Sequence, residues 1–439
     1  MADSNSSTTQ QEATDDDCPL APGRQTRNIL CFAGLWCCYY LVAPVSYVGV
    51  THANLLKNLG SSDTVANLPH AFFQWASAFP VFVAWFFPQV RLLKFQLVTC
   101  LVAKAASAGA VALTIWLRLP ADWVIVSVIT FGAVFGAANG VMLITLWELL
   151  RRGVSTARRG KALGLTFGVG PLFACAASAA QQLVAVQDVP DGSGAAVPSL
   201  NNFLVIFGAA CPILIASAWI AAQFVVPLPA DEPRAERLTE ITTGLREFLT
   251  YRPVALAAVA YMLVYSGGNA IIDTASIHAR EMLSSIAPDT VGYQNLLRFG
   301  FKSATGVLLG WLLAKTNPKA TLLATTCILL LGMFWILNVD GRWYLVSFGL
   351  LGAGELFGAY FPNYVTTASS KSRVRTNVAY MNLTGSFVGM ASILFGLISD
   401  RYGRFATFYT ATGILLAALL LIIAFLPSNP QPRDESIAH

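Results

Sequence analysis

Long apolar runs follow one another along most of the chain, and short polar segments separate them. Each run holds about 20 residues or more, which is the length that an α-helix needs to cross the hydrocarbon core of a bilayer. The runs are unbroken, whereas strands of outer-membrane barrels alternate apolar and polar residues over about ten positions. The pattern predicts an all-α polytopic membrane protein with twelve transmembrane helices. Their expected ranges are 28–50, 64–88, 93–116, 121–148, 161–184, 201–226, 254–277, 290–314, 320–338, 343–367, 376–399 and 405–426.

The second half of the chain repeats the first at a fixed shift of 226 positions. A register that holds without a gap over two helices and their loop indicates two six-helix pseudo-repeats. The matched positions are Tyr39 with Tyr265, His52-Ala53 with His278-Ala279, Asp63-Thr64-Val65 with Asp289-Thr290-Val291, Ser77-Ala78 with Ser303-Ala304, and Trp85 with Trp311.

The repeat predicts a division of the chain into two bundles and three polar segments. The central segment favours either a short amphipathic helix that reaches about Phe248 or a solvated linker. The predicted parts are a disordered cytoplasmic tail (1–23), an N-terminal six-helix bundle (24–226), a cytoplasmic central linker (227–251), a C-terminal six-helix bundle (252–427) and a cytoplasmic tail (428–439).

Composition agrees with a membrane protein. Hydrophobic residues make up 55% of the 439 residues, charged residues 12%, and the mean hydropathy is +0.60. Soluble domains average about 25% charged residues, so a soluble domain is excluded. Seven of the eight cysteines lie inside apolar runs, where they act as small buried hydrophobes. We find no P-loop, metal cluster or catalytic triad. The sequence therefore predicts neither an enzyme nor an ATP-driven pump, and no cofactor, metal or nucleic-acid partner.

The Lys and Arg residues are unevenly divided between the two sides of the predicted bundle. With the N-terminus in the cytoplasm, 19 of the 28 fall on the cytoplasmic side and six on the other side. The remaining three, Lys104, Arg298 and Lys302, lie within predicted helices. Positively charged loops favour the cytoplasmic side of a membrane. We therefore expect a multi-pass inner-membrane protein with both termini in the cytoplasm.

This architecture resembles the major facilitator superfamily. Gly396-Leu-Ile-Ser-Asp400-Arg401-Tyr-Gly403-Arg404 looks like that family's first signature, although it follows the eleventh helix. Gly310…Lys315-Thr-Asn317-Pro-Lys319 keeps parts of the same signature after the eighth helix, with Ala314 in place of Asp. Gly170-Pro171 resembles part of the antiporter signature. The resemblance implies alternating access around a site between the halves, lined by the first, fourth, seventh and tenth helices.

Charged residues inside the predicted helices are the principal candidates for a site. Arg298 and Lys302 are four residues apart and share one helix face. A cation near the middle of a spanning helix costs roughly 2.5–3.5 kcal/mol, so it is kept where it meets a partner, a cavity or a substrate. Glu355 lies in the middle of the tenth helix. The sequence leaves two possibilities open: a transport site in which Glu355 carries protons, or a fixed ion pair. Asp273 is either a second proton-coupling carboxylate or a wet helix end.

Several uncharged residues complete the candidate site. Gly267 and Gly268 interrupt the seventh helix as a hinge or, alternatively, as a site of close packing. His70 and Gln74 share a face of the second helix, where we expect a helix–helix hydrogen bond. Substrate contacts are expected from Lys302, Arg298, Tyr265, Asn269, Tyr39, Tyr47, Asn139 and Asn363.

These residues together predict a secondary transporter that moves a small polar, possibly anionic solute by alternating access. We expect a monomer in the lipid bilayer, with H⁺ as the coupling ion. One alternative is proton-coupled efflux of amphipathic compounds. Another is a non-transporting sensor or assembly factor on a transporter scaffold.

Overall fold

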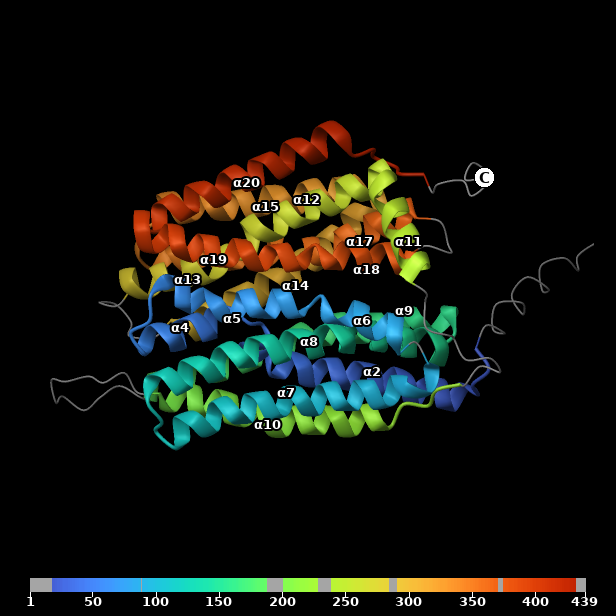
Figure 1. The fold of residues 1–439 in the computed structure, drawn as a ribbon, viewed down its shortest axis with the longest axis horizontal. Helices are drawn as coiled ribbons and strands as arrows, with labels where there is room; N and C mark the ends of the chain where they lie inside the picture. Colours follow the sequence, from blue (N-terminus) through green and yellow to red (C-terminus); the bar gives the residue numbers. More distant parts are fainter. Residues whose placement is uncertain are drawn as a thin grey trace, which may run out of the picture.

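The computed structural model describes residues 18–87, 89–187, 200–227, 238–283, 290–369 and 374–431. The helices in these ranges run side by side along the long axis of the molecule (Figure 1). Within the described ranges, nine helical segments are long and apolar enough to span a membrane, which makes the chain a multi-pass membrane protein. They are Val90–Trp116, Ala121–Leu150, Asn201–Ala222, Arg252–Leu283, Val291–Leu313, Pro318–Asn338, Gly341–Ala368, Tyr380–Tyr402 and Arg404–Phe425.

Three predicted spans, 28–50, 64–88 and 161–184, are not among those nine, and two of them are divided into shorter helices. The first is broken after Leu41 and again at Tyr47 and Gly49. The second is interrupted near Pro80, which has no backbone N–H to donate to the preceding turn. The N-terminal helices are α2 (Pro22–Leu41), α3 (Ala43–Ser46), α4 (Val50–Asn58), α5 (Asp63–Ala76), α6 (Phe79–Phe86), η1 (Val90–Leu92), α7 (Leu93–Trp116), α8 (Ala121–Gly153), α9 (Thr156–Gln187) and α10 (Asn201–Ala222).

The C-terminal helices repeat the broken first element. Helix α12 ends at Gly268 and α13 begins at Ile271, just as the first element of the N-terminal half is broken before α4. Part of the central linker is helical, and Phe248 on that helix packs against Tyr380. The helices are α11 (Leu238–Thr250), α12 (Arg252–Gly268), α13 (Ile271–Leu283), α14 (Val291–Lys315), α15 (Pro318–Asn338), η2 (Gly341–Leu345), α16 (Val346–Gly354), α17 (Phe357–Ala368), α18 (Val374–Leu383), α19 (Gly385–Tyr402) and α20 (Arg404–Phe425).

Each half of the chain has its own hydrophobic core. Phe131 and Phe207 belong to the first core, and Leu329 and Phe361 belong to the second. The blue-to-green helices occupy one side of the molecule and the yellow-to-red helices the other, and α2 begins at the end where α20 finishes (Figure 1). Between the halves, α5 packs against α19 and α9 packs against α14. A site between the halves is therefore bounded by α4, α5 and α9 on one side and by α13, α14 and α19 on the other.

Candidate functional site

Arg298, Lys302 and Glu355 form a buried ion-pair triad in the C-terminal half. The carboxylate accepts from Arg298 Nε at 2.6 Å and from Nη2 at 2.5 Å, and from Lys302 Nζ at 3.0 Å. The Arg298 and Glu355 side chains are each 4% exposed, and the Lys302 side chain is 20% exposed. The two cations lie one turn apart on α14, and Glu355 lies in the short break between α16 and α17. Helix α14 and the break between α16 and α17 thus bring three charged side chains into contact.

The triad has two positive charges and one negative charge, and one of its hydrogen-bond donors is unused. Arg298 Nη1 is buried and has no hydrogen-bond partner in the described part of the chain. The ring of Tyr47, which comes from the N-terminal half, lies 5.1 Å from Lys302 Nζ and 5.5 Å from the Arg298 guanidinium carbon. Aromatic faces attract cations at such distances. Tyr47 therefore brings the N-terminal half into contact with the triad.

A buried histidine–aspartate pair, His70 and Asp273, joins the two halves. His70 Nδ1 on α5 lies 2.8 Å from Asp273 Oδ2 on α13, and the side chains are 3% and 1% exposed. On the other side of the imidazole, the amide nitrogens of Gln74 and Asn269 lie 3.0 Å and 3.3 Å from Nε2. Gln74 also donates to the Tyr265 hydroxyl at 2.9 Å. Asp273 is therefore enclosed between the halves and is not a wet helix end.

Close approach of the backbone helps to enclose Asp273. Gly49 has φ +154°, and a Cβ atom at this position would lie 2.6 Å from Asp273 Oδ1. Only glycine combines that backbone conformation with such a contact. Asp273 Oδ1 is buried and has no hydrogen-bond partner within the described ranges. The break before α4 thus places the N-terminal half directly against this carboxylate.

Tyr39 and Asn139 lie in another cluster, around Lys104 in the N-terminal half. Asn139 Oδ1 accepts from the Tyr39 hydroxyl at 3.0 Å and from Lys104 Nζ at 2.9 Å. The ammonium group also lies 4.7 Å from the Tyr39 ring centroid and 4.6 Å from that of Phe135. Lys104 is fully buried. No carboxylate pairs with it in the described part of the chain, so two rings and an amide oxygen solvate this cation.

The remaining predicted residues lie outside these three clusters. Asn363 lies on α17, more than two turns beyond Glu355, and joins none of these clusters in the described structure. Gly267 and Gly268 end α12, so the predicted hinge coincides with a real interruption of the helix. Both glycines are also closely packed. A Cβ atom on Gly268 would lie 2.5 Å from Leu329 Cδ1, and one on Gly267 would lie 2.9 Å from Leu415 Cγ.

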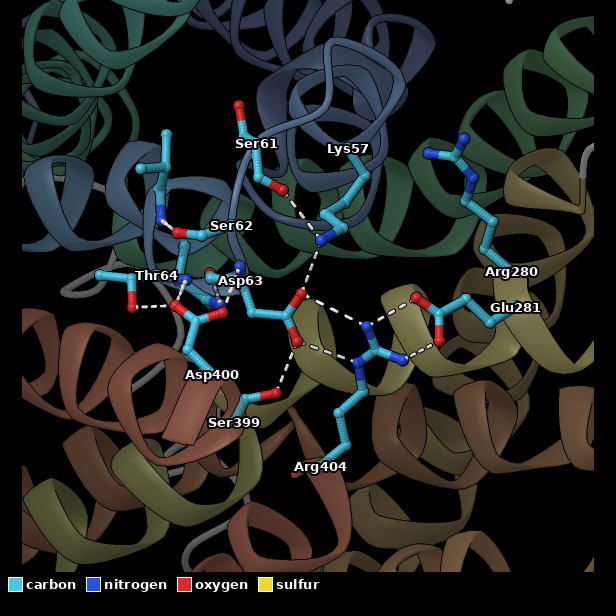
Figure 2. Close-up of polar contacts among 12 residues, drawn as sticks. Lys57, Ser61, Ser62, Asp63, Thr64, Arg280, Glu281, Ser399, Asp400 and Arg404 are labelled. Atoms are coloured by element: carbon cyan, nitrogen blue, oxygen red, sulfur yellow. Dashed lines mark hydrogen bonds and ion pairs between the residues drawn. The ribbon is translucent and has the colours of Figure 1, made fainter. Parts of the chain in front are cut away.

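Charged residues also join the halves at the end of the bundle opposite the termini (Figure 2). Asp400, at the end of α19, accepts from the backbone N–H groups of Asp63 at 2.8 Å and Thr64 at 2.9 Å. It therefore satisfies free donors at the N-terminus of α5, where a negative charge is favoured. Asp63 in turn accepts from Arg404 Nε at 2.9 Å, and Arg404 also pairs with Glu281. The Asp400–Arg404 segment of the signature-like run is thus a contact between the halves.

The Asp63 carboxylate is held in its charged form by these contacts. Burial alone would raise its pKa, but hydrogen bonds from Arg404, Ser399 and Lys57 outweigh burial and lower the pKa from 3.8 to about 2. Figure 2 shows Lys57, Ser399 and Arg404 converging on this one carboxylate. The cluster therefore remains ionised at any physiological pH.

Solved structures of similar shape identify the architecture. A mutant of the nucleoside transporter NupG superposes with a TM-score of 0.65 and 11% sequence identity over 91% of this chain and 100% of that one. The xylose transporter XylE from E. coli gives 0.63 and 14% over 93% and 97%. The peptide transporter POT in complex with sulfate gives 0.64 and 13% over 94% and 97%. This chain has the major facilitator superfamily fold. No protein-family model and no curated protein matches the sequence.

Within the major facilitator fold, the structure adds two groups to the candidate site. His70 and Gln74 contact each other within α5, and they form the expected helix–helix hydrogen bonds with Asp273 and Tyr265 of the opposite half. Lys104 joins Tyr39 to Asn139. The i, i+4 spacing of His70 and Gln74 was the available signal. It could not reveal the partners, because these are about 200 positions away in the sequence.

Proposed function

We propose that this protein is a secondary active transporter that moves a small polar, anionic solute across the membrane by alternating access, coupled to protons. It acts as a monomer in the inner membrane, with both termini in the cytoplasm. Substrate contacts come from the triad and the aromatic and amide side chains around it. The observation that carries this proposal is the unequal charge of the triad.

The triad supports an anionic solute because one carboxylate faces two cations, the buried Arg298 and the partly exposed Lys302. A buried excess charge is costly unless it acquires a partner. Arg298 Nη1 is an unused donor in this cluster. A guanidinium offers its donors in a planar fork that matches carboxylate and phosphate oxygens. An anionic group would therefore satisfy both the charge and the free donor.

Contacts between the halves support alternating access. Asp400 and Arg404 contact α5 at the end opposite the termini. At the same end, Arg280 Nη1 donates to the Asn54 carbonyl at 3.2 Å, and Asn54 donates to Ser276 Oγ at 2.7 Å. Arg280 and Asn54 are equivalent positions of the repeat, so the pseudo-twofold axis passes close to this contact. In the proposed cycle these polar contacts break when this end opens.

A thermal-stability screen of the purified protein tests the proposal. The panel contains organic acids, sugars, nucleosides, peptides and amphipathic drugs. A ligand at 100 times its Kd stabilises the folded state by about 2.7 kcal/mol if it does not bind the unfolded state. We expect stabilisation by a carboxylate or a related anion, and loss of that effect in Lys302→Ala. The matched control is Lys315→Ala, which removes an exposed lysine from the same helix.

Two results would contradict the anionic solute. Stabilisation by amphipathic cations alone would favour efflux of amphipathic compounds. An anion that stabilises Lys302→Ala as strongly as the wild type would bind at another site. In either case the triad is a structural ion pair.

A further inference from the structure

We infer that the transported proton is taken up by the His70–Asp273 pair rather than by Glu355, with one proton accompanying one monoanion. This inference rests on the proposed transport function and specifies how its coupling works. It starts from the hydrogen-bond directions around the imidazole. It then compares the net charge of the pair with the net charge of the triad.

The contacts of the imidazole define its protonation state. The Gln74 amide nitrogen lies 3.0 Å from His70 Nε2 and 2.9 Å from the Tyr265 hydroxyl oxygen. The Asn269 amide nitrogen also faces Nε2, at 3.3 Å. Amide nitrogens only donate, so with the two amides in this orientation Nε2 accepts and carries no proton. The ring proton is therefore on Nδ1, where it donates to Asp273 Oδ2 at 2.8 Å.

A neutral imidazole beside an ionised Asp273 leaves the pair with one negative charge. Both side chains are almost completely buried. Asp273 Oδ1 has no hydrogen-bond partner in the described part of the structure. A buried carboxylate without a cation is strongly destabilised relative to water. One added proton neutralises the pair and converts it to an imidazolium–carboxylate ion pair.

Uptake of that proton requires a new acceptor for Nε2–H, and Gln74 can provide one. A rotation of the Gln74 side-chain amide by a half turn places its oxygen against Nε2. The same rotation turns the amide oxygen toward the Tyr265 hydroxyl, which can then donate instead of accept. The proton on His70 is thus linked to Tyr265 in the opposite half.

Glu355 is less suited to take up the proton. Its two carboxylate oxygens already accept from Arg298 and Lys302. A proton on Glu355 would leave the buried Arg298 and the partly exposed Lys302 without an anion, and nearby cations favour the ionised carboxylate. Protonation of the His70–Asp273 pair is favoured instead, because none of its described contacts is a cation. The excess charges of the pair and the triad are therefore −1 and +1.

The surroundings of His70 contain few other ionisable groups. Asp273 on α13 contacts it directly, and His52 on α4 lies within electrostatic range of it. Tyr265 on α12 contacts Gln74 and lies within electrostatic range of the triad. Helices α8 and α19 approach α5 through glycines. A Cβ on Gly132 would lie 2.3 Å from the Pro69 carbonyl oxygen, and one on Gly389 would lie 2.7 Å from that of Ala71. Asp400 on α19 and Lys57 on α4 lie further along, at the start of α5.

The −1 and +1 charges explain why one proton and one monoanion travel together. The anion neutralises the triad and the proton neutralises the pair. With only one of the two bound, an uncompensated charge remains buried in the region that must rearrange. The fully loaded and fully empty carriers have the same net charge, so transport of a monoanion is electroneutral.

Histidine-selective NMR of the protein in lipid nanodiscs tests the proton site without any ligand. The chain has four histidines, and His70→Gln assigns the signal of His70 by its loss. We expect acidification to add a proton at His70 Nε2, so that the ring changes from the Nδ1–H neutral form to imidazolium. Asp273→Asn is expected to weaken this response to acid, because it removes the anion that favours the charged ring. His52→Gln is the control, and the His70 titration should persist in it.

A wild-type His70 ring that stays neutral down to the lowest pH at which the protein remains folded would overturn the inference, and so would a response to acid that Asp273→Asn leaves unchanged. These outcomes are separate from those of the ligand screen. An anion that requires Lys302, combined with a His70 ring that does not titrate, would retain the transport function and exclude this proton site. A His70 ring that titrates as expected, in a protein that no anion stabilises, would retain this proton site and exclude the proposed transport of an anion.

Discussion

Two charged groups lie near Tyr265, and we infer that they are opposite in sign. The triad of Arg298, Lys302 and Glu355 belongs to one half and has an excess positive charge. The His70–Asp273 pair is shared between the halves, and in our inference it has an excess negative charge before it takes up a proton. A buried group that is fully paired resists protonation, whereas one that lacks a cation favours it. We therefore assign the anion to the triad and the proton to the His70–Asp273 pair.

Removal of the negative charge from the triad should have the largest effect on stability. Glu355→Gln leaves the buried Arg298 and the partly exposed Lys302 without a carboxylate, and loss of one partner from a buried ion pair costs about 3–5 kcal/mol. Reversible unfolding in mixed detergent measures this free energy. Asp340→Asn, at an exposed carboxylate, is the control. A loss below about 1 kcal/mol would mean that the triad is not a buried ion-pair cluster.

The cluster of Figure 2 should have a smaller effect, and one that depends on pH. The pKa of Asp63 is lowered from 3.8 to about 2, so its stabilisation is complete above pH 3.8 and disappears as the pH falls through 2. A difference of this size corresponds to roughly 2 kcal/mol. Asp63→Asn should destabilise the protein by that amount at pH 6, and the difference from wild type should shrink on acidification. A constant difference between pH 6 and pH 3 would contradict this account of the contact.

Lys302 and Lys104, the two lysines inside the bundles, should differ in their effect on anion binding. Lys302→Met removes a cation of the triad and should raise the Kd of the stabilising anion at least tenfold, which is about 1.4 kcal/mol. Lys104→Met is the matched control, because Lys104 is enclosed by Tyr39, Phe135 and Asn139. Its Kd should stay within about twofold of wild type. Isothermal titration calorimetry measures both constants, and equal weakening would place the anion elsewhere.

The smallest expected effect is that of Asp273→Asn on stability. This substitution removes a buried negative charge that has no cation, so the lost hydrogen bond to His70 is offset by the smaller desolvation cost. We expect a change below about 1 kcal/mol at pH 7, in contrast to Glu355→Gln. The same unfolding assay compares the two variants. A loss as large as that of Glu355→Gln would show that the pair is a stabilising ion pair with a charged His70.

Much of the fold could be predicted from the sequence, because apolar runs and the repeat directly reflect helix length and bundle symmetry. The contact of Glu355 with Arg298 and Lys302 was also within reach, since charges buried in a membrane need partners. The pairing of His70 with Asp273 was not. It depends on how the two halves are rotated against each other, and no local pattern records that rotation. The same holds for the aromatic and amide surroundings of Lys104.

Uptake of the stabilising anion into proteoliposomes is the most direct test of the central claim. A pH gradient, acid on the uptake side, should drive accumulation of a monoanion with one proton per anion. A membrane potential imposed with valinomycin and K⁺ should not change the rate, because the loaded carrier gains no net charge. In His70→Gln, anion exchange should continue while accumulation driven by the pH gradient is lost. Uptake driven by the potential alone, or accumulation that survives in His70→Gln, would contradict the account.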